Sequence, residues 1–258
     1  MTISDQAIID PTAEIDSGVE IGPWTHIGPR VRIGKDTKIG SHVVIKENTT
    51  MGANNVVHPF ASIGGDPQVK AYTHHDSFLE IGDHNVFHEY ATISRGDISG
   101  TGVTKIGNHN LFMACTHVAH DCIIHDSTIF VNNAAVAGHV EVQDFVVLGA
   151  YCAVHQFCHI GMHSFLSRGA MVAQDVVPYT MVVGNPPKVC GINKVGLSRR
   201  GFSKDQIANI MYCYKAIFRR QATLAEAIKA IEIEIPEPDA SIKAILEGLR
   251  VSERGIVR

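Results

Sequence analysis

The stretch from residue 14 to residue 40, EIDSGVEIGPWTHIGPRVRIGKDTKIG, decides the fold. An isoleucine returns at every sixth position in it, at Ile15, Ile21, Ile27, Ile33 and Ile39. An amphipathic helix needs an apolar residue every three or four positions, and a half-buried strand needs one at every second position. A strict period of six therefore predicts a solenoid, in which each hexad supplies one short strand and one corner.

The period extends far beyond this stretch. Aliphatic or similar apolar residues recur at every sixth position in three runs of the chain. The first long run extends from Ile3 to Ile63, a short run from Ile81 to Ile93, and the second long run from Ile106 to Val172. Three hexads would close a triangular coil of 18 residues, and successive coils would stack at the ~4.8 Å spacing of paired strands. The aliphatics would then fill a continuous axial core. Gly, Asn and Asp follow many of them, which suits corners that need left-handed or tight backbone.

Two stretches break the period, at residues 64–80 and 94–105. Both are predicted to be loops that leave the solenoid. Binding groups concentrate on loops that a rigid scaffold carries, so these loops are candidates for function.

The period stops at Pro178, and the sequence Gly184-Asn185-Pro186-Pro187 reads as a turn that ends the solenoid. Ser203 with Gln206 and Thr223 with Glu226 have the spacing of capping boxes ahead of helical patterns, and a third helix is expected near Asp239. The prediction is a mainly β protein with a β-helix at residues 1–188 and a small α-helical domain at 189–258.

Composition excludes several classes of protein. The chain has 258 residues, 45% of them hydrophobic and 19% charged, with a formal charge of −4, which is typical of a globular protein that binds no nucleic acid. Its longest apolar run, residues 145–154, is too short to span a bilayer, and the first ten residues lack the basic start of a secretory signal. A cytoplasmic location is expected.

The six cysteines form no CxxC pair and are predicted to be reduced residues that fill the core.

Histidine placement gives the first indication of chemistry. His120, His139 and His155 are 19 and 16 residues apart, close to one coil each, so they are expected to stack along one region of the prism. A neutral imidazole is a suitable general base for a hydroxyl that attacks a carbonyl, provided that a second group orients it. Asp121 directly follows His120 and is the candidate for that group.

Several segments resemble a known family. They are Thr116-His117-Val118-Ala119-His120-Asp121-Cys122, Ala137-Gly138-His139-Val140, Ala153-Val154-His155-Gln156-Phe157-Cys158, Val172-Ala173-Gln174-Asp175 and Leu197-Ser198-Arg199-Arg200-Gly201-Phe202-Ser203. Together they look like the UDP-N-acetylglucosamine O-acyltransferase family, which carries out the first acylation of lipid A synthesis. The hexads alone resemble the wider bacterial transferase hexapeptide superfamily, whose coils wind left-handed and whose members are typically homotrimers with active sites between subunits.

The resemblance implies a role for each matching residue. His120 would be the base that deprotonates the 3-hydroxyl of the sugar, Asp121 would orient it, and the backbone N–H of Gly138 would face the oxyanion that forms on the thioester of a 3-hydroxyacyl carrier protein. Substrate contacts would come from His117, His139, His155, Gln156, Lys70, Tyr72, Asn193, Arg199 and Arg200. Arginine suits a diphosphate because its planar fork donates two hydrogen bonds at once. No metal and no cofactor is implied.

Between Lys188 and Arg220 the chain has eight basic residues and one acid, Asp205, a local excess of seven positive charges. A basic face on an otherwise acidic protein attracts an acidic partner such as an acyl carrier protein. An ordinary solvated helix face is the alternative interpretation.

The sequence departs from the family at positions that concern the substrates. The usual Asp-Leu-Lys-Tyr of the first loop reads Val69-Lys70-Ala71-Tyr72, a usual His is Ser94, and a nucleotide-contacting Glu is Val195. Arg168 stands where long-chain members have Gly, at the position that measures the acyl chain. A larger side chain at the end of an acyl groove predicts a shorter hydroxyacyl chain.

Three other interpretations stay open. The altered first loop allows a related transferase that acylates a 3-amino sugar nucleotide or uses acetyl-CoA. A zinc enzyme of the gamma carbonic anhydrase type shares the β-helix and could take ligands from His117, His120, His125 and His139. A catalytically silent scaffold is disfavoured by the intact pair of His120 and Asp121.

Overall fold

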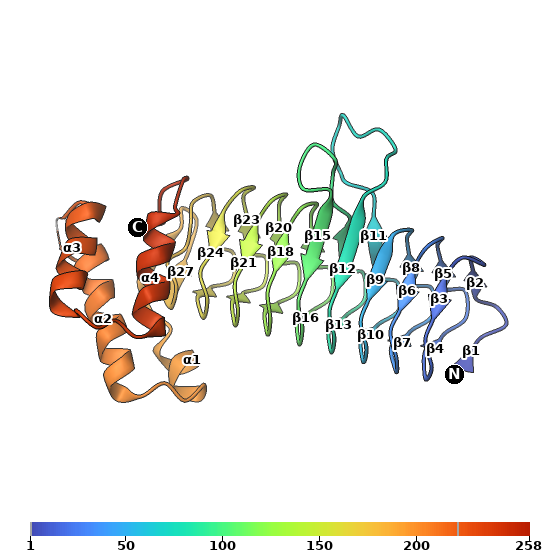
Figure 1. Ribbon diagram of the computed structural model, residues 1–258, viewed down its shortest axis with the longest axis horizontal. Helices are drawn as coiled ribbons and strands as arrows, with labels where there is room; N and C mark the ends of the chain where they lie inside the picture. Colours follow the sequence, from blue (N-terminus) through green and yellow to red (C-terminus); the bar gives the residue numbers. More distant parts are fainter. Residues whose placement is uncertain (1, 221) are drawn as a thin grey trace.

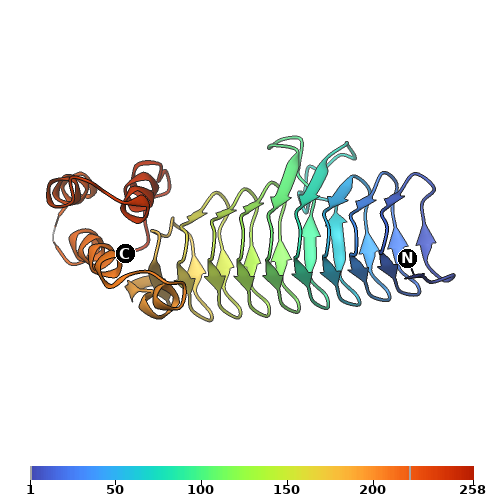
Figure 2. The same ribbon diagram turned by 60° about the horizontal axis from the view of Figure 1, so that its bottom comes forward.

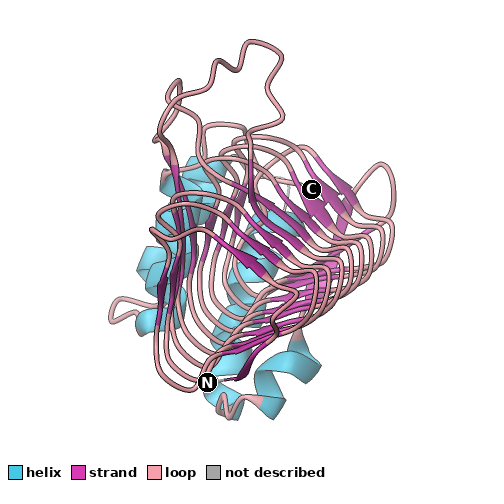
Figure 3. Cartoon of the chain, turned by 90° about the vertical axis from the view of Figure 1, so that its right-hand side faces the viewer, coloured by secondary structure: helices cyan, strands magenta, loops and turns pink. Residues whose placement is uncertain are grey.

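The computed structural model describes residues 2–220 and 222–258. Up to Val183 the chain forms a left-handed parallel β-helix of short strands; one antiparallel strand follows, and four helices close the C-terminal end (Figure 1). Viewed along its length the β-helix is a triangular prism with one sheet on each side (Figure 3). The predicted solenoid is confirmed.

The prism has three sheets, here named A, B and C in the order in which the chain visits them. Sheet A contains β1 (Thr2–Ile3), β4 (Glu20–Ile21), β7 (Lys38–Ile39), β10 (Val56–Val57), β13 (Val86–Phe87), β16 (Leu111–Phe112), β19 (Ile129–Phe130), β22 (Val147–Leu148), β25 (Phe165–Leu166), β27 (Thr180–Val183) and β28 (Lys188–Ile192). Sheet B contains β2 (Ile8–Ile9), β5 (His26–Ile27), β8 (Val44–Ile45), β11 (Ser62–Gly65), β14 (Thr92–Ser94), β17 (His117–Val118), β20 (Ala135–Val136), β23 (Ala153–Val154) and β26 (Met171–Val172). Sheet C contains β3 (Glu14–Ile15), β6 (Arg32–Ile33), β9 (Thr49–Met51), β12 (Phe78–Ile81), β15 (Val103–Ile106), β18 (Ile123–Ile124), β21 (Glu141–Val142) and β24 (His159–Ile160).

Strands pair in parallel with the strand one coil away, so that Ile21 is opposite Ile39, 18 residues later. The second residue of each two-residue strand is the hexad aliphatic, and it points into the prism. In the middle coils the axial core is filled by Phe87, Phe112 and Phe130, whose ring centroids are 4.9 Å apart in each neighbouring pair. Cys122, Cys152 and Cys158 are buried in the same core, as predicted, and burial raises the pKa of the Cys122 thiol to about 12. For Cys115 and Cys190 the prediction of a core position was wrong, because both are exposed.

The corners correct one expectation about glycine. The left-handed corner position is mostly occupied by aromatic, His, Asn and Asp residues, for example Trp24 (φ 56°) and Asn48 (φ 57°). The glycine that follows an aliphatic serves another purpose: a Cβ on Gly22 would lie 2.7 Å from the backbone of the next coil. Glycine is therefore needed there for the close stacking of coils, because no side chain fits between them.

The two interruptions are loops, as predicted, and both leave the prism at the corner between sheets B and C (Figures 1 and 3). The first loop connects β11 to β12 and the second connects β14 to β15. Arg95, at the start of the second loop, is 1% exposed and forms ion pairs with Asp66 (2.5 Å) and Glu47 (2.9 Å). This buried cation fastens the first loop to the coil beneath it.

The outer faces of the three sheets differ in polarity. Outward positions of sheet C include Glu14, Arg32, Glu80, Lys105 and Glu141. Outward positions of sheet A from the fourth coil onward are apolar, namely Val56, Val86, Leu111, Ile129, Val147, Phe165 and Met181. Of these two faces, the mostly charged face of sheet C is therefore the better suited to exposure to water.

On sheet C a carboxylate lies between two histidines of neighbouring coils. Glu141 accepts hydrogen bonds from His125 Nε2 (2.9 Å) and His159 Nδ1 (3.1 Å). These bonds hold the pKa of Glu141 at about 2 and raise the pKa values of both histidines. The lowered pKa of Glu141 means that its carboxylate stabilises the fold fully at pH values above the ordinary pKa of a glutamate. The raised pKa values of the two histidines mean that they stabilise the fold fully at pH values below the ordinary pKa of a histidine. The network therefore contributes most to stability between about pH 4.5 and 6.5.

We therefore expect Glu141→Gln to lower the melting temperature by roughly 2–4 °C at pH 5.5, and by less at pH 8 because the histidines have lost their protons there. Thermal melts of both proteins at the two pH values measure this difference. The matched control is Glu14→Gln, whose carboxylate has an exposed arginine and no histidine as partner. An equal loss for Glu141→Gln at both pH values would contradict the interpretation.

The helical unit consists of α1 (Lys194–Arg199), α2 (Lys204–Phe218), α3 (Leu224–Glu234) and α4 (Ala240–Arg250) (Figure 2). The capping boxes predicted at Ser203 and Thr223 are present, and Asp239 caps α4. The short helix α1 was not foreseen. No helix among the described residues is both long and apolar enough to span a bilayer. At residue 188, the predicted domain boundary, the antiparallel strand β28 begins.

Candidate active site

His120 and Asp121 occupy the corner between sheets B and C, one coil beyond the second loop. His120 Nδ1 lies 2.7 Å from a carboxylate oxygen of Asp121, whose side chain is inaccessible to water. Burial by itself raises the pKa of Asp121, but hydrogen bonds from His120, Thr101 and the backbone outweigh it and lower that pKa below its ordinary value. An ionised carboxylate only accepts hydrogen bonds, so Nδ1 of His120 carries the proton and Nε2 is free to act as a base.

Gly138 lies directly beneath the His120 ring, on the next coil of the same corner. A Cβ at this position would be 2.7 Å from His120 Cε1 and from Nε2. Among residues 2–220 and 222–258, the Gly138 N–H donates no backbone hydrogen bond. An imidazole nitrogen that can accept a proton and an available backbone donor are therefore neighbours, an arrangement that suits a carbonyl addition.

The structure brings His139 to the corner that holds His120 and Asp121, and places His155 farther along it. The His139 ring meets the His120 ring edge-on, with centroids 5.1 Å apart, and stacks on Phe157 at 4.5 Å. The spacings of 19 and 16 differ from the coil length of 18, so the three histidines fall in three adjacent columns. His155 and Gln156 are exposed, and His155 Nδ1 lies 3.2 Å from the backbone oxygen of Gln156.

His117 lies on the outer face of sheet B, in β17, just before the corner that holds His120 and Asp121. Its Nδ1 is 2.8 Å from the Thr92 hydroxyl. Burial, and secondarily the neighbouring His120, lowers the pKa of His117. A neutral ring at this position can hydrogen-bond to a sugar hydroxyl without adding charge to the site.

Lys70 and Tyr72, the two substrate contacts predicted in the first loop, differ from each other in their surroundings. Lys70 is exposed, whereas the Tyr72 ring packs edge-on against His75 with centroids 4.9 Å apart. Tyr72 also lines a depression on this loop together with Arg30, Glu47 and Arg95. Tyr72 therefore supports the loop, and Lys70 is the one that is free to meet a ligand.

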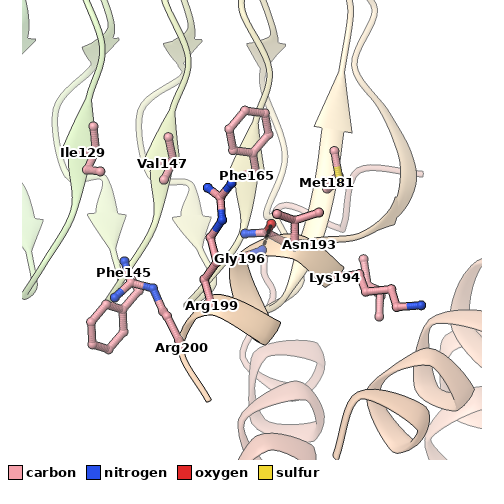
Figure 4. Close-up of a pocket in the computed structure, with 12 residues that line it drawn as sticks. Ile129, Phe145, Val147, Phe165, Met181, Asn193, Lys194, Gly196, Arg199 and Arg200 are labelled. Carbon is pink, nitrogen blue, oxygen red and sulfur yellow. Dashed lines mark hydrogen bonds between the residues drawn. The ribbon is translucent and has the colours of Figure 1, made fainter. Parts of the chain in front are cut away.

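Asn193, Arg199 and Arg200 come together elsewhere, at a cavity of about 640 Å³ between sheet A and α1 (Figure 4). The guanidinium of Arg200 lies 4.0 Å above the centroid of the Phe145 ring. Asn193 is partly committed to the fold, because its side chain caps α1 by accepting from the Gly196 N–H (3.1 Å) and donates to the His163 carbonyl (2.9 Å). Sequence reasoning did not identify the capping role.

The floor of this cavity is apolar and was also missed from the sequence. It is formed by outward residues of sheet A, namely Ile129, Val147, Phe165 and Met181. The sequence did contain a signal for this surface. The residue before each hexad aliphatic faces outward, and in successive coils of sheet A this residue is apolar. Such a run of outward apolar side chains indicates a surface that is covered by a ligand or a partner. The cavity thus combines cations with an apolar wall, which suits a ligand that has both an anionic and an apolar part.

The two groups of residues lie on different sides of one chain. His120 and its neighbours are at the corner between sheets B and C, whereas the arginines flank sheet A. Arg168, the predicted chain-length determinant, is exposed at a third place, the corner between sheets A and B.

A zinc site with three ligands from His117, His120, His125 and His139 finds no support in the arrangement of one chain. His125 is hydrogen-bonded to Glu141 on sheet C, and His117 belongs to the face of sheet B. Donor atoms of His120, Asp121 and His139 do lie within 4.8 Å of one another. Asp121, however, accepts hydrogen bonds on both of its oxygens from the second loop and from His120.

Comparison with known proteins gives a consistent picture. The family description "Udp N-acetylglucosamine O-acyltransferase; Domain 2" matches residues 175–257, and "Bacterial transferase hexapeptide (six repeats)" matches residues 30–65. An acyl-[acyl-carrier-protein]–UDP-N-acetylglucosamine O-acyltransferase of Janthinobacterium sp. (strain Marseille) is 46% identical over 255 residues, which cover 98% of this chain and 97% of that protein.

Solved structures agree with this result. The UDP-N-acetylglucosamine O-acyltransferase of Moraxella catarrhalis RH4 superposes with a TM-score of 0.97 at 40% identity and covers 100% of both chains. The corresponding acyltransferase of Francisella novicida gives a TM-score of 0.97 at 38% identity, covering 100% of this chain and 94% of that one. With its β-helix, its helical unit and its histidine corner, this chain belongs to the UDP-N-acetylglucosamine O-acyltransferase family.

Proposed function

We propose that this acyltransferase transfers a 3-hydroxyacyl chain from an acyl carrier protein to the 3-hydroxyl of UDP-N-acetylglucosamine, the first step of lipid A synthesis, with His120 as its general base. The observation that carries the proposal is the arrangement of His120 over Gly138, with Asp121 holding Nδ1 at 2.7 Å. The names of the relatives support this sugar and this donor.

The chemistry follows from these atoms. His120 Nε2 takes the proton of the sugar hydroxyl as its oxygen attacks the thioester carbonyl. The oxyanion that forms faces the Gly138 N–H. When the C–S bond breaks, the proton passes from His120 to the departing thiolate of the carrier, so that an ester and a free thiol result. Asp121 stays ionised throughout and stabilises the imidazolium.

The cavity beside α1 is the proposed site for the nucleotide diphosphate. Arg199 and Arg200 supply planar donors for phosphate oxygens. The outward residues of sheet A supply an apolar wall for a hydrocarbon chain. Because this cavity and His120 lie on different sides of the prism, one chain cannot offer both to a single substrate.

A homotrimer resolves this separation. The apolar outer positions of sheet A need a partner, and those of sheet B are small or apolar at Val44, Ala135, Ala153 and Met171, whereas sheet C is charged. If sheet B of one copy faces sheet A of the next, the catalytic corner of one meets the arginines of the other. Sedimentation should then give three times the 28.0 kDa of the chain.

All eight basic residues between Lys188 and Arg220 are exposed on β28, α1, α2 and the segments that flank them. They form a positive surface that adjoins the cavity, and an acidic acyl carrier protein suits it. A cytoplasmic location is part of the same proposal, and six free cysteines are in keeping with a reducing compartment.

The proposed function is tested by acyl transfer from hydroxyacyl carrier protein to UDP-N-acetylglucosamine and, in parallel, to its 3-amino analogue. Ester formation with the first sugar should exceed amide formation with the second, and acetyl-CoA should not replace the carrier protein. Preferential acylation of the 3-amino sugar would show that Val69, Ala71 and Ser94 mark a change of acceptor.

A separate prediction concerns the length of the acyl chain. The wild-type protein should prefer a short hydroxyacyl thioester, and Arg168→Gly should improve use of a chain several methylenes longer by about 10-fold or more, because each methylene gains apolar burial once the side chain is gone. Competition between carrier-protein thioesters of graded length measures this change. Lys35→Gly is the control, because Lys35 is also an exposed cation directly before a left-handed corner residue but lies outside the proposed binding surfaces. An unchanged preference in Arg168→Gly would exclude a measuring role.

A further inference from the structure

The second loop folds over the carboxylate of Asp121. Three of its backbone N–H groups point at that side chain: Asp97 donates to Oδ2 (3.0 Å), and Thr101 and Gly102 donate to Oδ1 (2.8 and 3.0 Å). The Thr101 hydroxyl is 2.8 Å from the same Oδ1. With His120 at Oδ2, five donors surround one carboxylate, and four of them come from residues 97–102.

The direction of the Thr101 hydroxyl bond can be deduced. Its oxygen also lies 3.0 Å from the Val103 carbonyl, and a hydroxyl has only one proton to give. If that proton went to the carbonyl, a lone pair of Thr101 would face an ionised carboxylate. Donation to Asp121 is therefore favoured, and it is a charge-assisted bond.

The loop is also fitted tightly to this corner. A Cβ on Gly100 would lie 2.5 Å from the His139 ring and 2.8 Å from the Asp121 carboxyl carbon, so only glycine allows this approach. On the far side His75 of the first loop accepts the Ile98 N–H at its Nε2 (3.0 Å). Contacts on both sides thus fix the loop relative to the catalytic pair.

We propose that the loop Asp97–Gly102 orients the catalytic pair, His120 and Asp121. Within this loop Thr101 is a positioning residue: its hydroxyl fixes the rotamer of Asp121 and, through Asp121, the orientation of the His120 ring. The inference rests on the proposed role of His120 as the base. Thr101 touches no substrate atom in this proposal. It acts on Oδ1 of Asp121, so that Oδ2 stays directed at His120 Nδ1.

The physical reason is that the Asp121 side chain is inaccessible to water. If the hydroxyl is lost while its volume is kept, no water can replace it, and Oδ1 loses one of its three donors. The carboxylate then gains by turning toward other donors, which draws Oδ2 away from His120. A small displacement of a base is costly for turnover, whereas substrate affinity depends on other groups.

The test uses Thr101→Val, which keeps the shape and removes the hydroxyl, and Thr101→Ser, which keeps the hydroxyl. In the full-length protein we expect Thr101→Val to lower kcat about 10-fold with KM for both substrates unchanged, and Thr101→Ser to restore kcat to within about twofold of wild type. Thr50→Val is the matched control, because Thr50 lies exposed on the outer face of sheet C. A Thr101→Val protein with wild-type kcat, or with raised KM alone, would overturn the proposal.

A double-mutant cycle separates this inference from the proposed function. In an Asp121→Asn background the anion is absent, so Thr101→Val should cause no further loss of kcat, whereas an additive loss would contradict an action through Asp121. If His120→Ala retained turnover, the proposed base itself would be wrong. If His120→Ala is inactive while Thr101→Val is fully active, only the positioning role fails.

Discussion

His120→Ala is expected to lower kcat about 1,000-fold, which corresponds to about 4 kcal/mol of transition-state stabilisation. The alanine leaves the Gly138 N–H and both proposed substrate sites in place, so KM should change little. Residual turnover would come from the oxyanion donor and from proximity of the two substrates. Steady-state assays of acyl transfer at saturating donor measure kcat directly.

His26→Ala is the matched control for this variant. His26 is an exposed strand residue of sheet B in the second coil, far along the prism from the catalytic corner. It should retain wild-type kcat. Equal thermal stability of the two variants would exclude unfolding as the cause of the loss, and a His120→Ala protein with more than about a tenth of wild-type kcat would remove His120 from the mechanism.

Gly138→Ala is expected to be almost as damaging, with kcat lowered about 100-fold. The new Cβ would lie 2.7 Å from His120 Cε1 and Nε2, well inside the 3.5–4.0 Å of a normal carbon contact. Gly138 does not have a left-handed backbone, so alanine costs the fold little there. The ring must swing away, and it then loses both its alignment with Asp121 and its place above the N–H donor.

The control is Gly191→Ala, whose Cβ would meet nothing within 4 Å and whose backbone is not left-handed. Combining Gly138→Ala with His120→Ala distinguishes the two consequences. If displacement of the ring is the cause, the double variant should be no slower than His120→Ala alone. A Gly138→Ala protein with wild-type kcat would show that the ring adopts another position during turnover.

The architecture could be predicted from the sequence because one periodic pattern controls it. Every hexad aliphatic from Ile21 to Val172 is buried where the period of six places it. The interruptions at 64–80 and 94–105 correctly identified the two loops, and the capping boxes at Ser203 and Thr223 correctly identified two helix starts. In each case a local rule and the tertiary structure agree.

The details of the site were less accessible, because they depend on the register within a coil. Spacings of 19 and 16 suggested one stack of histidines, yet a shift of one residue moves a side chain to the next column, so His139 reaches His120 and His155 lies farther off. The bonds between Thr101 and Asp121 join residues 20 apart through a loop that follows no repeat. Patterns in sequence give no signal for such a contact.

The fixed length of a coil makes the prism modular in one specific way. Each coil of 18 residues begins and ends at the same corner, so a whole coil added or deleted near the N-terminus would leave every later residue on its original face. A single hexad inserted between β18 and β20 would instead turn everything downstream by a third of a revolution. Gly138 would then move from beneath His120 to a different corner of the prism. The insertion of six residues would thus separate the residues of the proposed active site, although the period of six that fills the core would remain unbroken.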